Sequence, residues 1–128
     1  LEVGIGSMDK NVPLNMNYDT NIYRHPPERL KEWVYTVGAS LMAWLDVFPE
    51  ANITGLDIDR SALVHGARLN SKLCNTLNAS NVREVLLGNS FDFIVDDGLH
   101  TPQGQRATLR ALWPYLRLGG LYVIEDVL

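Results

Sequence analysis

The chain has 128 residues, of which 46% are hydrophobic and 20% are charged, and its formal net charge at pH 7 is −4. This length suits a single domain, 1–128, with enough apolar residues to form a core. The acidic balance argues against a nucleic-acid partner, and no apolar run is long enough to cross a membrane. Because Cys74 is the only cysteine, no internal disulfide can form, and we expect a cytoplasmic location.

The first part of the chain predicts a strand, a long loop and a helix. Residues 1–5 read as the end of an apolar strand. Residues 7–37 are too many for an ordinary connection between a strand and a helix, so we expect a long loop or lid there. An amphipathic helix before Pro49 is predicted from the spacing of four apolar residues, Leu41, Trp44, Leu45 and Phe48.

Further apolar runs predict buried strands at 53–58, 91–95 and 121–124, with a weaker strand near 72–75. Three helices are predicted between these strands. The first begins after Asp59 and carries Leu63, Val64 and Ala67, and the second is short and ends before Gly88. The third opens on Thr101-Pro102, an N-cap followed by proline, and stops at Gly119-Gly120.

This alternation of strands and helices predicts an α/β fold with a Rossmann-like, doubly wound parallel sheet between two layers of helices. In the strand order 3-2-1-4-5, the first strand lies between the second and the fourth, and the fourth lies beside the fifth. We expect the terminal strands of such a fold to lie outside this sequence. Residues that follow neighbouring strands should then meet at one edge of the sheet.

Two glycines and an acid follow the first two strands. Gly4 and Gly6 allow a close approach of the backbone to a ligand, and Asp57 ends the second strand, where a carboxylate can accept both ribose hydroxyls. A third glycine is missing at position 9, which argues against a nicotinamide cofactor. The E-x-G-x-G pattern that begins at Glu2 instead resembles motif I of class I S-adenosylmethionine-dependent methyltransferases. The alternative is that Asp57 and Asp59 only cap the next helix.

Four acids follow the fourth and fifth strands, Asp96, Asp97, Glu125 and Asp126. Carboxylates gathered in a partly desolvated cleft repel one another and need either a cation or raised pKa values. Their oxygen atoms suit Mg²⁺, and Asp97 is the first choice of ligand because it lies nearest the glycine turn. Asp96 is expected to hold backbone amides or the cofactor. The alternative is that these acids cap helices or bind loop amides.

The segment from Asp97 to His100, together with Glu125-Asp126 and the runs around Ser40 and Gly120, resembles the macrocin and mycinamicin family of metal-dependent sugar O-methyltransferases. This resemblance implies that Asp97, Glu125 and Asp126 hold Mg²⁺ and that His100 is the catalytic base. It also implies cofactor binding by seven residues, Glu2, Gly4, Gly6, Ser40, Asp57, Asn75 and Asp96. Two positions depart from the pattern, because Asn75 stands where many relatives have an acid and Leu99 stands where the family usually has serine.

The resulting hypothesis is an O-methyltransferase that uses S-adenosylmethionine and Mg²⁺ and acts on a hydroxyl of a small molecule such as a sugar or glycoside. Mg²⁺ would lower the pKa of the hydroxyl, and His100 would remove its proton. Two alternatives stay open, a non-catalytic or truncated cofactor-binding module and a metal-independent methyltransferase. No membrane partner is expected, and a homo-oligomer is left open.

Overall fold

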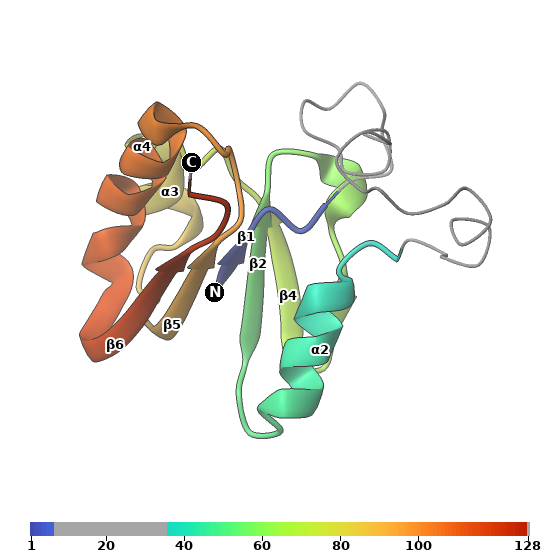
Figure 1. Ribbon diagram of the computed structural model, residues 1–128. Coiled ribbons are helices and arrows are strands. Elements are labelled where there is room, and N and C mark those ends of the chain that lie inside the picture. Colours follow the sequence, from blue (N-terminus) through green and yellow to red (C-terminus); the bar gives the residue numbers. More distant parts are fainter. Residues whose placement is uncertain (7–35, 128) are drawn as a thin grey trace.

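The computed structural model describes residues 1–6 and 36–127, and it shows a sheet with helices on both faces (Figure 1). The prediction of a lid at 7–37 falls almost entirely outside the described residues. The division into one domain also stays a prediction. The described elements are β1 (Glu2–Val3), α2 (Ala39–Val47), β2 (Ile53–Asp57), η1 (Arg60–Ala62), β3 (His65–Gly66), β4 (Leu69–Leu73), α3 (Ala79–Val85), β5 (Phe91–Asp96), α4 (Pro102–Leu112), η2 (Trp113–Tyr115) and β6 (Leu116–Ile124).

The sheet has the strand order β3-β4-β2-β1-β5-β6. Five of the strands pair in parallel, in the order β4, β2, β1, β5 and β6. This is the predicted order 3-2-1-4-5, so the fold class is confirmed. The difference is β3, a short strand that pairs antiparallel with β4 and makes the sheet mixed. The central position of β1, between β2 and β5, brings the residues that follow these three strands to one edge.

The predicted helix after Asp59 is wrong. Asp59 does cap a helical turn, since its side chain accepts from the backbone N–H of Ser61, but that turn is the short η1. The chain then leaves the helical path because Ser71 binds both backbone groups of Val64: its hydroxyl accepts from the N–H and donates to the carbonyl. These bonds attach Val64 to β4, which begins at Leu69 instead of near residue 72.

The predicted end of the last helix is also wrong. Thr101 caps α4 as expected, but the helix ends at Leu112, and Pro114 then lies in η2 because it cannot donate the next helical hydrogen bond. Gly119 and Gly120 lie inside β6, which begins at Leu116. Gly119 has a φ of 82°, and the register of β6 against β5 shifts at this place, so the two glycines form an irregularity in a strand.

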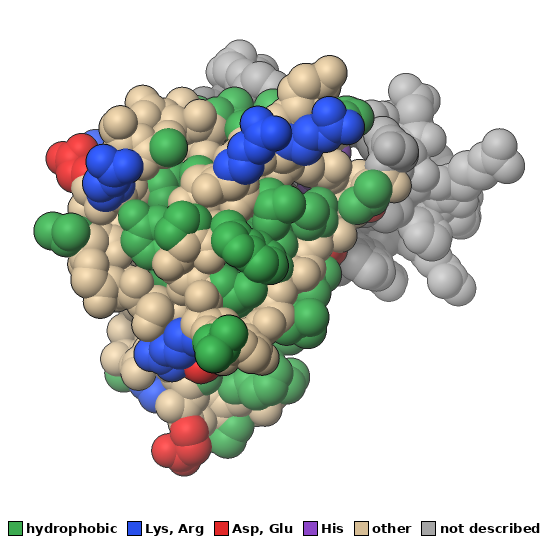
Figure 2. All heavy atoms as spheres, turned by 90° about the vertical axis from the view of Figure 1, so that its left-hand side faces the viewer, with side chains coloured by type: hydrophobic (Ala, Val, Ile, Leu, Met, Phe, Trp, Pro, Cys, Tyr) green, Lys and Arg blue, Asp and Glu red, His purple; other side chains and the backbone are tan. Residues whose placement is uncertain are grey.

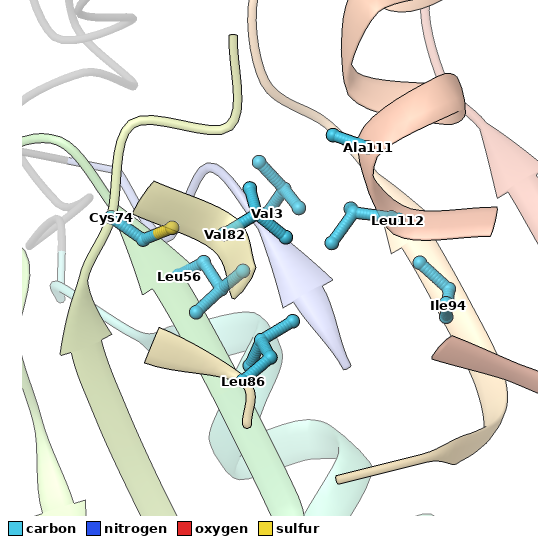
Figure 3. Packing of buried hydrophobic residues seen from close by; sticks show 8 residues of the cluster. All are labelled: Val3, Leu56, Cys74, Val82, Leu86, Ile94, Ala111 and Leu112. Carbon is cyan, nitrogen blue, oxygen red and sulfur yellow. The ribbon is translucent and has the colours of Figure 1, made fainter. Parts of the chain in front are cut away.

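Each face of the sheet carries its own core. On one face, buried residues of the strands pack against α3 and α4 in a cluster of Val3, Leu56, Cys74, Val82, Leu86, Ile94, Ala111 and Leu112 (Figure 3). On the other face, Leu41 of α2, which is fully buried, packs with Ile5, Ile53, Ala62 and Leu69. The predicted helix over Leu41 to Phe48 is confirmed by α2, apart from its last residue. The two cores give the expected three layers.

The outer face of α4 and β6 carries solvent-exposed hydrophobic side chains (Figure 2). Trp113 and Leu121 are each 59% exposed, and β6 is the edge strand of the described sheet. The expectation that terminal strands of this fold lie outside the sequence stays a prediction. Among the described residues, no helix is long and apolar enough to span a bilayer.

Candidate active site

The polar residues predicted from strand ends meet at the carboxyl edge of the sheet. The register places Val3 beside Leu56 on one side and beside Asp96 on the other. Asp96 in turn pairs with Ile124, and its carbonyl accepts from the backbone N–H of Glu125 at 2.9 Å. The turns after β1, β2, β5 and β6 are therefore neighbours, as the strand order predicted.

His100 lies between two carboxylates at this edge. Its Nε2 atom is 3.0 Å from Oδ1 of Asp97, and its Nδ1 atom is 3.4 Å from Oδ2 of Asp126. The side chains of His100 and Asp97 are 21% and 30% exposed, so this pair is half-buried, whereas Asp126 is open to solvent. One ligand atom from each of the three residues lies within 4.8 Å of the others, which makes them a group that could hold a metal ion.

The electrostatics of this cluster favour a bound cation. Burial and, to a smaller extent, the nearby charge of Glu125 raise the pKa of Asp97 to about 6, although the hydrogen bond with His100 opposes both effects. Glu125, the third predicted ligand, is exposed, and its carboxylate is not one of the three clustered groups. It nevertheless adds negative charge beside Asp97, and a divalent cation would relieve that repulsion.

Asp96 shapes the turn that presents Asp97. It is only 1% exposed, and its two carboxylate oxygens accept from the backbone N–H of Gly98 and from the hydroxyl of Tyr122, each at 3.3 Å. Burial raises the pKa of the Asp96 carboxyl. Of the two roles expected for Asp96, this geometry favours the binding of backbone amides over contact with a cofactor. Tyr122 was not among the predicted site residues.

The two glycines after β1 both have positive φ, 82° at Gly4 and 86° at Gly6. A Cβ atom at Gly4 would lie 2.1 Å from the carbonyl oxygen of Asp97. The backbone after β1 is therefore packed directly against the turn after β5, and the protein itself explains why residue 4 must be glycine. Close approach of a ligand, the reason expected from the sequence, is not required at Gly4.

Asp57 joins the ends of β1 and β2. Its Oδ2 atom accepts from the backbone N–H of Ile5, and its Oδ1 atom accepts from that of Asp59, each at 2.8 Å. The side chain is 8% exposed. Ile58 directly follows it and is 63% exposed.

Glu2 and Ser40, both predicted to bind the cofactor, bind each other. The carboxylate of Glu2 is buried and accepts from the hydroxyl of Ser40 and from the indole N–H of Trp44, the latter at 2.6 Å. Burial raises the pKa of Glu2, and these two hydrogen bonds oppose the rise. The three residues attach β1 to the first turns of α2. The spacing of Ser40 and Trp44, four residues apart on one helix face, was the available signal for this contact.

Asn75 follows β4, on the far side of β2 from the acid cluster. Its side-chain oxygen accepts from the backbone N–H of Leu77 at 3.0 Å, and its backbone N–H donates to the side-chain oxygen of Asn81 at 2.8 Å. Asn75 therefore closes the turn between β4 and α3. It shares the carboxyl edge with Asp57 but takes no part in the cluster around His100.

Comparison with known proteins relates the chain to sugar O-methyltransferases. No protein-family model matches it. It is 33% identical over 128 residues to mycinamicin VI 2''-O-methyltransferase of Micromonospora griseorubida and 32% identical to demethylmacrocin O-methyltransferase of Streptomyces fradiae. These matches cover 99% of the chain but only 26% and 27% of the two relatives, so the chain spans about a quarter of their length.

The solved structures agree with the sequence comparison. The MycE methyltransferase from the mycinamycin biosynthetic pathway, in complex with Mg, SAH and mycinamycin VI, matches with a TM-score of 0.71 and 31% identity. A second crystal form of MycE with Mg and SAH matches with a TM-score of 0.70. The first match covers 98% of this chain and 27% of the MycE chain. The Rossmann-like fold and the family resemblance expected from the sequence are confirmed.

Proposed function

Because the whole chain resembles a segment of the macrocin and mycinamicin sugar O-methyltransferases, we propose that it is the catalytic core of an O-methyltransferase that uses S-adenosylmethionine and Mg²⁺. The single observation that carries this proposal is the position of His100 between Asp97 and Asp126 at the carboxyl edge of the sheet. In parallel α/β sheets, ligands bind at this edge, where the strand order reverses.

The residues of the cluster fit a magnesium ion. Asp97 and Asp126 offer carboxylate oxygens, the ligand type that Mg²⁺ prefers, and Glu125 adds a third negative charge nearby. Burial and the charge of Glu125 raise the pKa of Asp97 to about 6 without a metal, and a bound cation would favour the ionised carboxylate instead. A bound Mg²⁺ supplies Lewis acidity, which lowers the pKa of an acceptor hydroxyl.

His100 is suited to remove the proton from that hydroxyl. Histidine is the side chain that most often serves as a general base. Each ring nitrogen faces a carboxylate, Nε2 towards Asp97 and Nδ1 towards Asp126. For one of these nitrogens to accept the proton, its carboxylate would have to turn to the cation, and the other carboxylate would then fix the orientation of the ring and stabilise the imidazolium.

The cofactor-binding edge is formed by the turns after β1, β2 and β4. Asp57 accepts one backbone N–H at each oxygen, and each oxygen retains a second lone pair with which it can accept a ribose hydroxyl. The exposed side chain of Ile58 offers an apolar surface for an adenine ring. Glu2, Ser40 and Asp96, whose polar groups already have partners within the protein, support these turns instead of contacting the cofactor.

The acceptor in this proposal is a hydroxylated small molecule such as a sugar or glycoside. Two further relatives are named for transfer to sugars of other natural products, L-olivosyl-oleandolide of Streptomyces antibioticus and a rhamnosyl tetracenomycin of Streptomyces olivaceus. A cytoplasmic location, the lack of a nucleic-acid partner and the oligomeric state stay predictions.

The proposal is tested by transfer of a radiolabelled methyl group from S-adenosylmethionine to a panel of glycosides, with Mg²⁺ or with a chelator. We expect transfer that requires Mg²⁺ and that His100→Ala abolishes. Transfer that persists in chelator would favour a metal-independent methyltransferase. Cofactor binding with no transfer to any glycoside would favour a non-catalytic module.

A further inference from the structure

Gln105 is a buried polar residue for which the proposed function gives no role. It lies in the first turns of α4 and is 9% exposed. Its side-chain amide donates to two successive backbone carbonyls, that of Glu125 at 3.0 Å and that of Asp126 at 3.3 Å. One buried amide on a helix therefore holds the turn that follows β6, twenty residues further along the chain.

This turn needs support because of its backbone conformation. Asp126 has a φ of 49°, and among the described residues it is the only non-glycine residue with a positive φ. L-residues adopt this conformation rarely, and it persists when surrounding contacts determine it. The two hydrogen bonds from Gln105 fix the carbonyls on both sides of the strained Asp126 backbone. The same conformation directs the Asp126 carboxylate towards Nδ1 of His100.

The first turn of α4 also supports the other half of the cluster. Thr101 caps the helix directly after His100, and its hydroxyl accepts from the backbone N–H of Gly104 at 3.1 Å. A Cβ atom at Gly104 would lie 2.9 Å from both the carbonyl oxygen and the side chain of Leu99. Leu99 thus occupies the space that Gly104 leaves open. One helical turn contacts the loops of both Asp97 and Asp126.

We propose that Gln105 is a positioning residue, which holds the Glu125–Asp126 turn so that the Asp126 carboxylate faces His100 and the cation site is preformed. The metal-binding part of this inference rests on the proposed function. Gln105 touches neither the cation nor the substrate, and it acts through the backbone of Asp126. Groups that orient metal ligands in this way typically contribute about ten- to a hundredfold to metal affinity.

The test compares Gln105→Met with Gln103→Met. Methionine has nearly the shape of glutamine without its donor, and Gln103 lies on the same helix turn but is exposed, so the second variant is a matched control. Two quantities are measured in each protein, the Kd for Mn²⁺ and, without metal, the ¹⁵N chemical shifts of the His100 ring. We expect Gln105→Met to weaken Mn²⁺ binding by about ten- to a hundredfold and to shift the His100 signals, while Gln103→Met changes neither.

Unchanged Mn²⁺ affinity and unchanged His100 signals in Gln105→Met would overturn the proposal. If the unaltered protein binds no Mn²⁺, the metal-binding function fails, and the His100 signals alone decide whether Gln105 positions Asp126. If Gln105→Met does not fold, it is replaced by Gln105→Asn, which stays polar but is one methylene too short to reach the two carbonyls. Failure of both variants to fold would overturn the proposal, because the role of Gln105 would then be general stability.

Discussion

Nε2 of His100 and Oδ1 of Asp97 lie 3.0 Å apart across the turn that joins β5 to α4. The two residues are three positions apart, and the turn between them is fixed at both ends. Asp96 binds the backbone of Gly98 before it, and Thr101 caps α4 after it. The short polar segment that interrupts the apolar sequence at residue 96 is therefore a rigid element that presents an acid and a base together.

Stability of the metal-free protein should decrease as the pH rises from about 4 to about 6. The pKa of Asp97 is raised by burial to about 6 in the folded state, above its ordinary value near 4, so the folded state binds the proton more tightly than the unfolded state. This group therefore favours folding at low pH, and its ionisation costs on the order of 2 kcal/mol above pH 6. Urea denaturation of the unaltered protein and of Asp97→Asn at several pH values measures this change in the free energy of unfolding.

Asp97→Asn should be more stable than the unaltered protein at pH 7 without metal, and its stability should vary less between pH 4 and pH 6. Asp46→Asn, which removes an exposed acid of α2, is the control for the loss of one charge. Equal pH dependence of Asp97→Asn and the unaltered protein would show that Asp97 is not the group responsible.

Mg²⁺ should stabilise the folded protein. At a free concentration 100 times Kd, a single site adds about 2.7 kcal/mol to the free energy of unfolding. Asp126→Asn should lose most of this increase because it removes a carboxylate of the cluster. Asp92→Asn, an exposed acid that pairs with Arg117, should retain it. The measurement is thermal denaturation over a series of Mg²⁺ concentrations, and an equal gain in both variants would place the cation elsewhere.

Gly4→Ala should be far more destabilising than Gly88→Ala, although both glycines have a positive φ, 82° and 77°. The new Cβ at position 4 would overlap the carbonyl of Asp97, whereas at Gly88 no atom lies within 4 Å. We expect the free energy of unfolding to fall by about 1 kcal/mol in Gly88→Ala, from backbone strain alone, and by more than about 3 kcal/mol in Gly4→Ala. Chemical denaturation compares them, and similar losses would mean that the turn after β1 can move away from Asp97.

Much of the fold could be predicted because short apolar runs bounded by glycine or aspartate, alternating with helical patterns, favour parallel strands. The structure of residues 63–73 could not be predicted, since the spacing of Leu63, Val64 and Ala67 suits a helix as well as it suits a strand. The deciding contact is between the Ser71 hydroxyl and the Val64 backbone, and it exists only after the chain has turned. In the same way, Gly119-Gly120 is a typical helix stop, and only its pairing with β5 makes it part of a strand.

The sequence could predict at which edge of the sheet the candidate site residues gather, but it could not predict their hydrogen-bond partners. Strand order alone brings Asp57, Asp97 and Asp126 to one edge of the sheet. The spacing of Ser40 and Trp44 places both on one face of α2, but that this face meets Glu2 depends on where α2 packs. Gln105 belongs to no motif, because its importance comes from reaching the backbone of a turn twenty residues away.

Calorimetric titration of S-adenosylhomocysteine tests the central claim most directly. The unaltered chain is compared with Asp57→Asn, which keeps the shape of the side chain, and with Asp46→Asn as the control for the lost charge. We predict binding by the unaltered chain and by Asp46→Asn, and an affinity at least about tenfold lower in Asp57→Asn, since a charged hydrogen-bond acceptor is lost. No binding by the unaltered chain, or equal binding by all three proteins, would contradict the proposed cofactor site at the end of β2.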